Sequence, residues 1–292
     1  MAPTSIIEDD WNSTVFDLWA EDSKEVGNSL WYIVGCLICI TLLSIVLILY
    51  MIIPNLRCVR GYKTCFFLLG LITAYLGMLA MNLRTMVIPC QVQGYLYAFG
   101  IVISVFWLNV LCYDCYALFR SSGGNSAEKN RFAYSCLYGW GGPLALLLFT
   151  LFMERAKTVQ ETLRPNFSTW ACYFIPNKTA EFLYFFLPVL LLMIIGIFFL
   201  LVGAYQARIL HRVPRNVVRF DRSSDHERFL FTLRIFIATA LTVTLNLASW
   251  VFAEALWLQW TSGICGYIMG VAIFLLCICN PEVTQWLAKR CC

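Results

Sequence analysis

The sequence predicts an all-α membrane protein: one bundle of seven transmembrane helices, with its N-terminus outside and its C-terminus inside the cell. Of the 292 residues, 60% are hydrophobic and 13% are charged, whereas soluble chains are about 45–50% apolar and about 25% charged. The chain also holds seven long apolar runs, and its basic residues gather in alternate connecting segments. These observations exclude a soluble multidomain enzyme, a disordered tail protein and a disulfide-stapled secreted miniprotein.

The predicted spans are runs of about 20 mostly apolar residues, the length that a helix needs to cross the hydrocarbon core of a bilayer. In chain order the runs are Leu30–Ile53, Cys65–Leu83, Gln91–Leu118, Tyr134–Met153, Ala180–Tyr205, Phe229–Phe252 and Trp257–Cys279. The second run is the weakest, because Thr73, Tyr75 and Asn82 interrupt it. No Pro-, Ser- or Gly-rich linker divides the chain, which predicts a single membrane domain over residues 30–279.

The two ends of the chain flank this domain. Residues 1–29 form a predicted short extracellular tail with seven Asp and Glu residues against Lys24 alone. A secretory signal peptide needs a basic n-region, so none is expected here, and the first span should serve as the insertion signal. Residues 280–292 are expected to form a cytoplasmic interfacial helix and tail, because Val283, Trp286 and Leu287 share one helical face.

Basic residues set the predicted orientation. The segments after spans 1, 3 and 5, together with the C-terminal tail, hold 14 Lys and Arg residues, and the opposite side holds six. Basic residues stay on the cytoplasmic side of membranes. Three glycosylation triplets, at Asn12, Asn166 and Asn177, all fall on the side that the charge rule places outside. Triplets also arise by chance in a chain of this length, but their common side favours the same orientation.

The cysteines fall into two groups. Most of the 14 lie inside apolar runs, where a thiol behaves as a small hydrophobic group. Only Cys90, at the outer start of the third span, and Cys172, in the second outer loop, clearly face an oxidising compartment. We expect a disulfide between them, with two free thiols as the alternative. Cys291 and Cys292 follow the predicted interfacial helix and are palmitoylation candidates, or else unmodified terminal cysteines.

Catalytic groups at membrane depth are nearly absent, which argues against an enzyme. The only histidines, His211 and His226, lie in the third inner loop, so no intramembrane zinc site can be built from histidine and no metal is expected. Asp114 is the one acid well inside a span, which excludes an aspartyl dyad, and no span holds an interior Lys for a retinal Schiff base. Ion transport usually needs several intramembrane ionisable groups. No cofactor is expected, and the basic inner face suits signalling to a soluble cytosolic partner.

Five short strings on successive parts of the bundle carry a family resemblance. They are Ile53-Pro54-Asn55-Leu56-Arg57, Phe106-Trp107-Leu108-Asn109-Val110-Leu111-Cys112-Tyr113-Asp114, Gly139-Trp140-Gly141-Gly142-Pro143, Leu233-Arg234-Ile235-Phe236 and Asn280-Pro281-Glu282-Val283. Together, over about Leu30 to Arg290, they resemble the secretin-type (class B) G-protein-coupled receptors, most closely the Methuselah-like branch of arthropods. Two departures stand out: Leu111 occupies the place of a class B glutamate, and the large ectodomain usual in Methuselah-like receptors is expected to be missing.

The resemblance implies a plasma-membrane receptor that passes an extracellular signal, of peptide class, to a heterotrimeric G protein by rearranging its helices. The implied ligand site is an outer cup, for which the candidate residues are Trp170, Tyr173, Glu254 and Trp257. The implied G-protein contacts are Arg57, Arg120, Arg208 and Arg212. The positive-inside bias alone also places arginines at such positions.

Asp114 is the candidate conformational lock, because an acid this deep in a membrane must find a donor or a cation. We expect it to pair with Arg234 or Arg57 and to release that partner on activation; the simpler alternative is an acid that reaches the interface. Asn109 and Asn246 are buried amides that should bond across helices. They either belong to the lock or only hold the bundle together.

Two other functions stay open. A seven-span chain without an ectodomain would also serve as a non-signalling partner or decoy of full-length receptors, which implies homo- or heterodimers. A carrier of uncharged solutes is compatible with the scarcity of ionisable groups. The lipid bilayer is a partner in every case, and no nucleic acid is expected.

Overall fold

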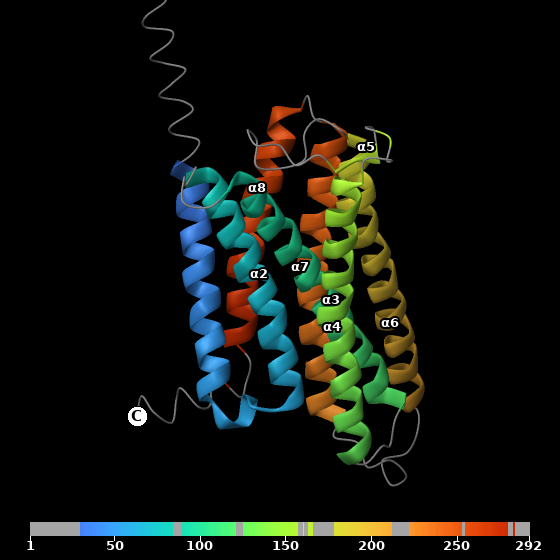
Figure 1. Cartoon of the computed structure of the whole chain (residues 1–292). Helices are drawn as coiled ribbons and strands as arrows, with labels where there is room; N and C mark the ends of the chain where they lie inside the picture. The colour runs from blue at the N-terminus through green and yellow to red at the C-terminus, as the bar shows by residue number, and fades with distance from the viewer. Residues whose placement is uncertain are drawn as a thin grey trace, which may run out of the picture.

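The computed structural model describes residues 30–83, 89–120, 125–156, 160, 163–165, 178–211, 222–252, 255–279 and 283. Within these residues, seven helices are long and apolar enough to cross a membrane, and no strand occurs. The predicted all-α seven-span bundle is therefore confirmed (Figure 1). The predicted outer tail, residues 1–29, lies outside the described residues, as does the predicted interfacial helix apart from Val283, which is buried.

The helices follow one another along the chain. They are the first helix Leu30–Ile52, α2 (Val59–Leu83), α3 (Cys90–Arg120), α4 (Asn125–Arg155), the short α5 (Lys178–Glu181), which continues through a π-helical turn (Phe182–Phe186) into α6 (Leu187–His211), then α7 (Arg222–Val251) and α8 (Leu256–Ile278). A single 3-10 turn, Pro54–Leu56, separates the first helix from α2. Proline at the start of that turn suits it, because the missing N–H would have no partner within the turn.

Several helices begin before the apolar run that predicted them. α2 begins at Val59 rather than at Cys65, and α4 begins at Asn125 rather than at Tyr134. Apolar length measures only the hydrocarbon-crossing part, whereas the backbone hydrogen bonds of a helix continue into the polar interface. The difference matters most in α2, because the added turns bring Lys63 into the helix.

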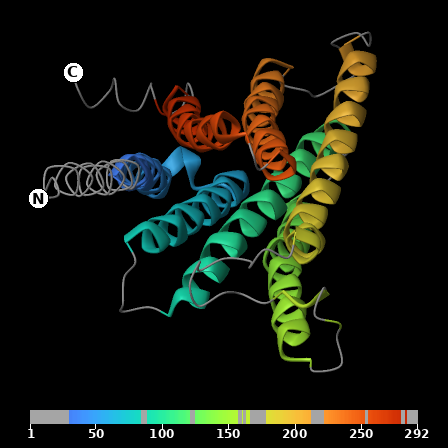
Figure 2. The ribbon, with the colours of Figure 1, turned by 90° about the horizontal axis from the view of Figure 1, so that it is seen from above.

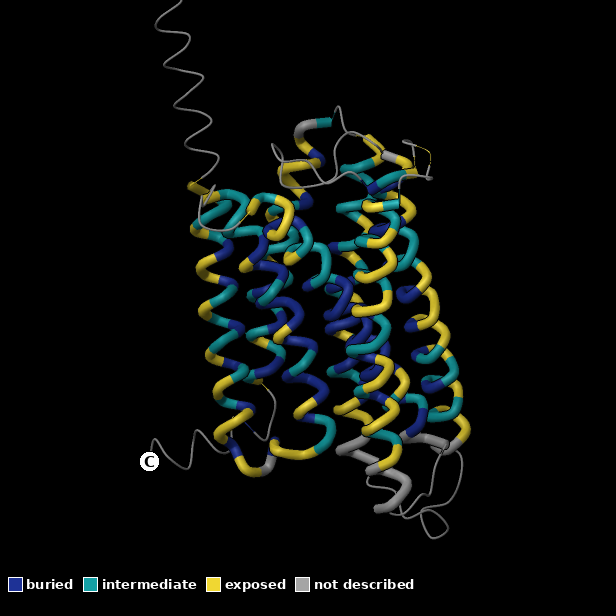
Figure 3. The backbone as a smooth tube through the Cα atoms, in the orientation of Figure 1, coloured by how far each residue is buried: buried dark blue, intermediate teal, exposed yellow. Residues whose placement is uncertain are grey.

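The central helix of the bundle is α3. It packs against α2, α4, α6 and α7, and Figure 2 shows it crossing the bundle diagonally between them. In its most apolar segment 67% of the residues are buried, against 11% in α4. The buried Trp107 of α3 contacts Phe66 and Trp140, with ring centroids 4.6 and 5.9 Å away. Buried residues accordingly concentrate on the inward faces, while α4 and α6 turn mostly exposed residues outward (Figure 3).

α2 and α3 approach each other closely at glycines. A Cβ built on Gly100 would lie 2.4 Å from the backbone nitrogen of Ala74, and one on Gly77 would lie 2.4 Å from that of Tyr97. Small residues allow membrane helices to bring their backbones together in this way. On α4, by contrast, the nearest atom to a Cβ on Gly141 is 3.8 Å away.

This difference gives a matched pair of substitutions. We expect Gly100→Ala to lower the stability of the bundle by about 1–3 kcal/mol, because backbone must move to admit the methyl group. Gly141→Ala should leave stability unchanged or raise it by up to about 1 kcal/mol, since alanine favours a helix over glycine. Melting temperatures of the two variants in detergent check this, and an equal effect of both would contradict the close approach.

Candidate functional site

A buried ion pair joins α2 to α3 at the end of the bundle that carries Arg57, Arg60 and Arg208, called the basic end below. The Lys63 ammonium donates to both carboxylate oxygens of Asp114, each at 2.8 Å. The Lys63 side chain is 2% exposed and that of Asp114 is 20% exposed. A buried charge without a partner costs several kcal/mol, so each of these groups depends on the other.

The ion pair corrects two expectations from the sequence. Asp114 pairs with Lys63, not with Arg234 or Arg57: Arg234 is exposed on α7, and the Arg57 guanidinium donates to the Met51 carbonyl at 2.7 Å. A lysine does lie inside a membrane-spanning helix, because α2 starts early. Its ammonium donates to the Asp114 carboxylate, whereas a Schiff base requires a free amine.

A second cation extends this cluster to α7. The Arg60 guanidinium on α2 donates to the backbone carbonyl of Arg228 at 2.8 Å and to the hydroxyl of Thr232 at 3.2 Å. Thr232 is fully buried. Arg60, Lys63, Asp114, Arg228 and Thr232 are called the basic-end latch below. These contacts connect α2 at once to α3 and to α7.

The two amides that were expected to bond across helices behave differently. The Asn109 amide is buried and donates to the Leu192 carbonyl of α6 at 2.9 Å and to the Val105 carbonyl of its own helix at 3.2 Å. The Asn246 amide donates only within α7 among the bonds described, to the Thr242 carbonyl at 2.8 Å. Asn109 therefore ties α3 to α6, whereas the expected cross-helix bond of Asn246 is not found.

A cavity of about 740 Å³ occupies the other end of the bundle. Its lining includes Tyr32, Asn82 and Gln259, which lie close to the ends of the first helix, α2 and α8. It also includes Ser104 and Thr239, which lie midway along α3 and α7, so the cavity extends from this end toward the middle of the bundle. Ligand pockets commonly measure about 300–1,000 Å³ and combine apolar walls with a few polar groups. The cavity thus has the size and composition of a small-molecule site.

Glu181 is the acid among the residues that line this cavity. It ends α5, and its carboxylate accepts a hydrogen bond from the Trp250 indole of α7 at 2.8 Å. The Trp250 ring lies against Phe182 and Phe186 of the π-helical turn, with centroids 5.8 and 5.3 Å apart. A π-helical turn often marks a functional site, and here it helps to place an acid and aromatic rings around one cavity.

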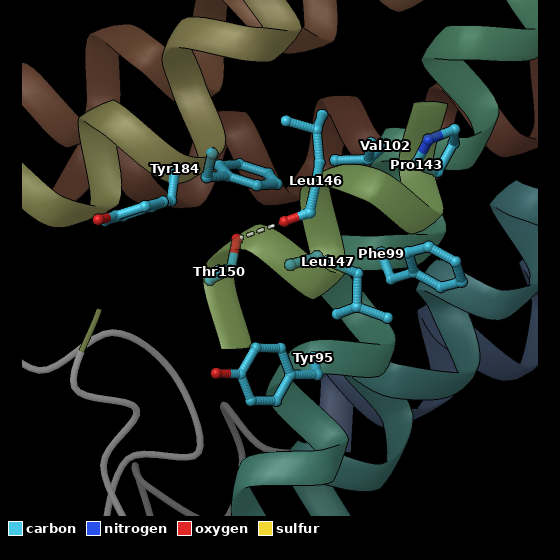
Figure 4. Close-up of a pocket in the computed structure, with 10 residues that line it drawn as sticks. Tyr95, Phe99, Val102, Pro143, Leu146, Leu147, Thr150 and Tyr184 are labelled. Atoms are coloured by element: carbon cyan, nitrogen blue, oxygen red, sulfur yellow. Dashed lines mark hydrogen bonds between the residues drawn. The ribbon is translucent and has the colours of Figure 1, made fainter. Parts of the chain in front are cut away.

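A much smaller recess lies between α3, α4 and the π-helical turn (Figure 4). Its volume of about 30 Å³ is enough for about one water molecule. Pro143 and Thr150 of α4 border it, and the Thr150 hydroxyl donates to the Leu146 carbonyl of its own helix at 2.8 Å. This recess is therefore a packing feature, and the large cavity is the candidate ligand site.

Most of the ligand residues predicted from the sequence cannot be placed. Trp170, Tyr173 and Glu254 lie outside the described residues. Trp257 is described, but it is 68% exposed and does not line the cavity. Glu181 and Trp250 were missed, although Glu181 offered a signal as an acid at the edge of the fifth predicted span.

The remaining predicted sites are only partly visible. Cys90 is disulfide-bonded at the first residue of α3, but Cys172 lies outside the described residues, so the pairing stays a prediction. The glycosylation candidates Asn12, Asn166 and Asn177, the lipidation candidates Cys291 and Cys292, and Arg212 are also outside the described residues, as is the side chain of Arg120. Of the predicted G-protein contacts, Arg57 and Arg208 are exposed at the basic end.

Comparisons with known proteins confirm the resemblance seen in the sequence. The chain is 25% identical over 269 residues to the G-protein coupled receptor Mth2 of Drosophila simulans, covering 86% of this chain and 50% of that receptor. It is 25% identical over 311 residues to Mth2 of Drosophila yakuba, covering all of this chain and 57% of the receptor. It is also 25% identical over 276 residues to the probable G-protein coupled receptor Mth-like 10 of Drosophila melanogaster, covering 86% and 47%. No protein-family model matches the chain.

The chain spans about half the length of these curated relatives. The similarity extends over most of the seven-helix bundle, and proteins with such names are receptors rather than enzymes. Together with the seven apolar helices, it indicates a multi-pass protein of the plasma membrane.

Proposed function

We propose that the chain is a G-protein-coupled receptor that carries an extracellular signal, of peptide class, to a heterotrimeric G protein on the cytoplasmic side. The names of the similar Drosophila proteins support the receptor class. The observation that carries the proposal for this chain is the basic-end latch, because it joins three helices at the end where a cytosolic partner would bind.

The latch offers a mechanism for switching. In the described conformation, Arg60 holds the basic end of α7 against α2 through the Arg228 carbonyl and the Thr232 hydroxyl. Moving the basic end of α7 outward would break both bonds and separate α7 from α2 and α3 at that end. A ligand shifts this equilibrium only if it binds the open conformation more tightly than the closed one.

The basic end also has the charge that the proposed partner surface needs. Arg57 is exposed in the connection between the first helix and α2, and Arg208 is exposed in the last turn of α6. With the predicted orientation, these side chains face the cytosol. We propose that they contact acidic groups of the G protein.

The proposal is tested in cells that express the full chain with epitope tags at both ends. We expect the N-terminal tag to be accessible in intact cells and the C-terminal tag only after permeabilisation. We also expect G-protein activation, measured as separation of its subunits by resonance energy transfer, to exceed that of cells without the chain. Arg208→Gln should reduce this signal severalfold, whereas Arg234→Gln, an exposed arginine on α7, should not.

Two results would overturn the proposal. Both tags on one face of the membrane would contradict the seven-span orientation. A chain that reaches the surface in the expected orientation but activates no G protein, with or without extracellular extracts, would instead favour the non-signalling partner of full-length receptors.

A further inference from the structure

The α7 wall of the large cavity carries a stripe of polar side chains. The residues that line the cavity from this helix include Thr239, Thr242, Asn246 and Ser249. Successive members are three or four residues apart, which places them on one face of the helix. At about 1.5 Å per residue, the stripe extends for roughly 15 Å along α7. It therefore offers several polar contacts to one elongated ligand.

The hydroxyls of this stripe already use their donors within α7. All three donate to carbonyls of their own helix, three or four residues earlier, at 2.8–2.9 Å. The Asn246 amide nitrogen donates in the same way to the Thr242 carbonyl at 2.8 Å. The Thr242 hydroxyl also lies 3.7 Å from the Cys265 thiol, and either atom could be the donor.

The acceptor sites of the stripe are less occupied than its donors. A hydroxyl has one donor and two acceptor sites, and an amide side chain has two of each. Among the described bonds, none ends on the Thr239 hydroxyl, the Ser249 hydroxyl or the Asn246 side-chain oxygen as an acceptor. The four residues, called the acceptor stripe below, thus keep free acceptor sites, whereas a second amide N–H of Asn246 is their free donor.

We propose that this cavity selects an elongated ligand that carries hydrogen-bond donors, N–H or O–H groups, along the edge that faces α7. The inference deepens the proposed receptor function, on which it rests for the ligand's role as a signal. The binding chemistry itself requires only the cavity and the acceptor stripe.

The existing bonds decide which ligand gains most. A ligand that offered acceptors to the hydroxyls would have to take their protons from the α7 carbonyls, so one hydrogen bond would replace another and little would be gained. A ligand donor instead adds a bond to a vacant lone pair. Ser104 of α3 extends the preference, because it lines the cavity and donates to the Ile101 carbonyl at 2.7 Å. Tyr32, Tyr97 and Gln259 line other walls, so the preference concerns the side of the ligand toward α7.

A cysteine placed within the stripe tests the preference directly. Val243 lines the cavity, and its Cβ lies about 5–6 Å from those of Thr239 and Asn246, its neighbours on the helix face. The purified full chain with Val243→Cys is incubated, under thiol-exchange conditions, with equal amounts of two disulfides. One is formed from N-benzyl-3-mercaptopropanamide, and the other from benzyl 3-mercaptopropanoate, the ester in which oxygen replaces the amide N–H.

Mass spectrometry of the peptides gives the ratio of amide to ester captured at position 243. Cys58, which is exposed in the connection between the first helix and α2, supplies the reference ratio in the same molecule. Relative to that reference, we expect the amide to be favoured at position 243 by about fivefold or more, the effect of one hydrogen bond of ordinary strength.

Variants of the stripe show which residues are responsible. Thr239→Val and Asn246→Leu, each combined with Val243→Cys, remove an acceptor with little change of volume and should move the ratio toward the reference. Thr244→Val is the matched control, because the Thr244 hydroxyl is exposed on the same helix and does not line the cavity. If either stripe variant fails to fold, the ratio at Val243→Cys alone still decides the question.

Three results would overturn the proposal: an amide-to-ester ratio at position 243 equal to or below the reference, no capture at that position, or the same fall in the ratio for Thr244→Val as for the stripe variants. None of these measurements involves a G protein, so failure here and failure of the proposed receptor function are distinguishable.

Discussion

Replacing Asp114 with alanine is expected to destabilise the bundle more than any other single substitution considered. The change would leave the Lys63 ammonium buried, at 2% exposure, without its carboxylate partner. Removing one member of a buried ion pair typically costs about 3–5 kcal/mol. For a chain of this size that corresponds to a fall of roughly 10 °C in melting temperature, measured on purified protein in detergent.

A second substitution should reverse most of this loss. Replacing both partners of a buried ion pair by apolar residues of similar volume is often neutral or stabilising. Lys63→Met combined with Asp114→Leu is therefore expected to melt close to the unchanged chain, although each single substitution is damaging. The strong non-additivity would identify the ion pair as the cause.

An exposed acid supplies the control. Glu227 lies on α7 with its side chain exposed, and Glu227→Ala should change stability by no more than about 0.5 kcal/mol. If the losses from Lys63→Met and Asp114→Leu simply add in the double variant, the two groups do not depend on each other, and the buried pair is refuted.

The lengths and compositions of the apolar runs were sufficient to predict the seven-helix bundle. These signals follow from the cost of exposing polar groups to hydrocarbon, which acts on every span alike. They do not locate helix ends, because hydrogen-bonded turns continue beyond the hydrocarbon. The early start of α2 is the consequential case, since it converted Lys63 from an expected loop cation into a buried helical residue.

The candidate site was less predictable for a related reason. Asp114 stood out because an acid at membrane depth needs a partner, but the sequence could not say which cation the helix packing would bring to it. A signal was present: Lys63 precedes Phe67 and Leu71 at intervals of four residues, and both are buried. That spacing places Lys63 on the buried face of α2.

The cavity residues depend on how each helix is rotated, which hydrophobicity alone does not give when a helix is apolar on all sides. Trp257 was expected in the ligand site because it lies near a helix end, yet its side chain is 68% exposed. Asn246 lines the cavity, but its amide bonds within its own helix. Glu181 was passed over because it stands second in its predicted span, and the described packing turns it inward to the cavity.

Removing Arg60 from the latch is expected to raise signalling without ligand. Arg60→Ala eliminates the bonds to the Arg228 carbonyl and the Thr232 hydroxyl, which join the basic end of α7 to α2 in the described conformation. A hydrogen bond from a charged donor contributes about 1.5–3 kcal/mol. If the bonds exist only in the closed conformation, their loss shifts the closed-to-open ratio by roughly 10- to 100-fold. G-protein activation per receptor at the cell surface should rise accordingly.

Thr232→Val separates the side-chain bond from the backbone one. It removes the hydroxyl that accepts from Arg60, together with that hydroxyl's own bond to the Arg228 carbonyl at 3.2 Å, and it leaves the bond from Arg60 to the Arg228 carbonyl in place. It should therefore raise basal activation less than Arg60→Ala, and it should add little once Arg60 is already alanine. Thr244→Val is the matched control, because the Thr244 hydroxyl is exposed and donates only to carbonyls of its own helix among the bonds described. If basal activation is measurable and stays unchanged in Arg60→Ala at normal surface expression, these contacts do not restrain α7. If Thr232→Val and Thr244→Val raise basal activation equally, the cause is a general weakening of the helix rather than loss of the latch.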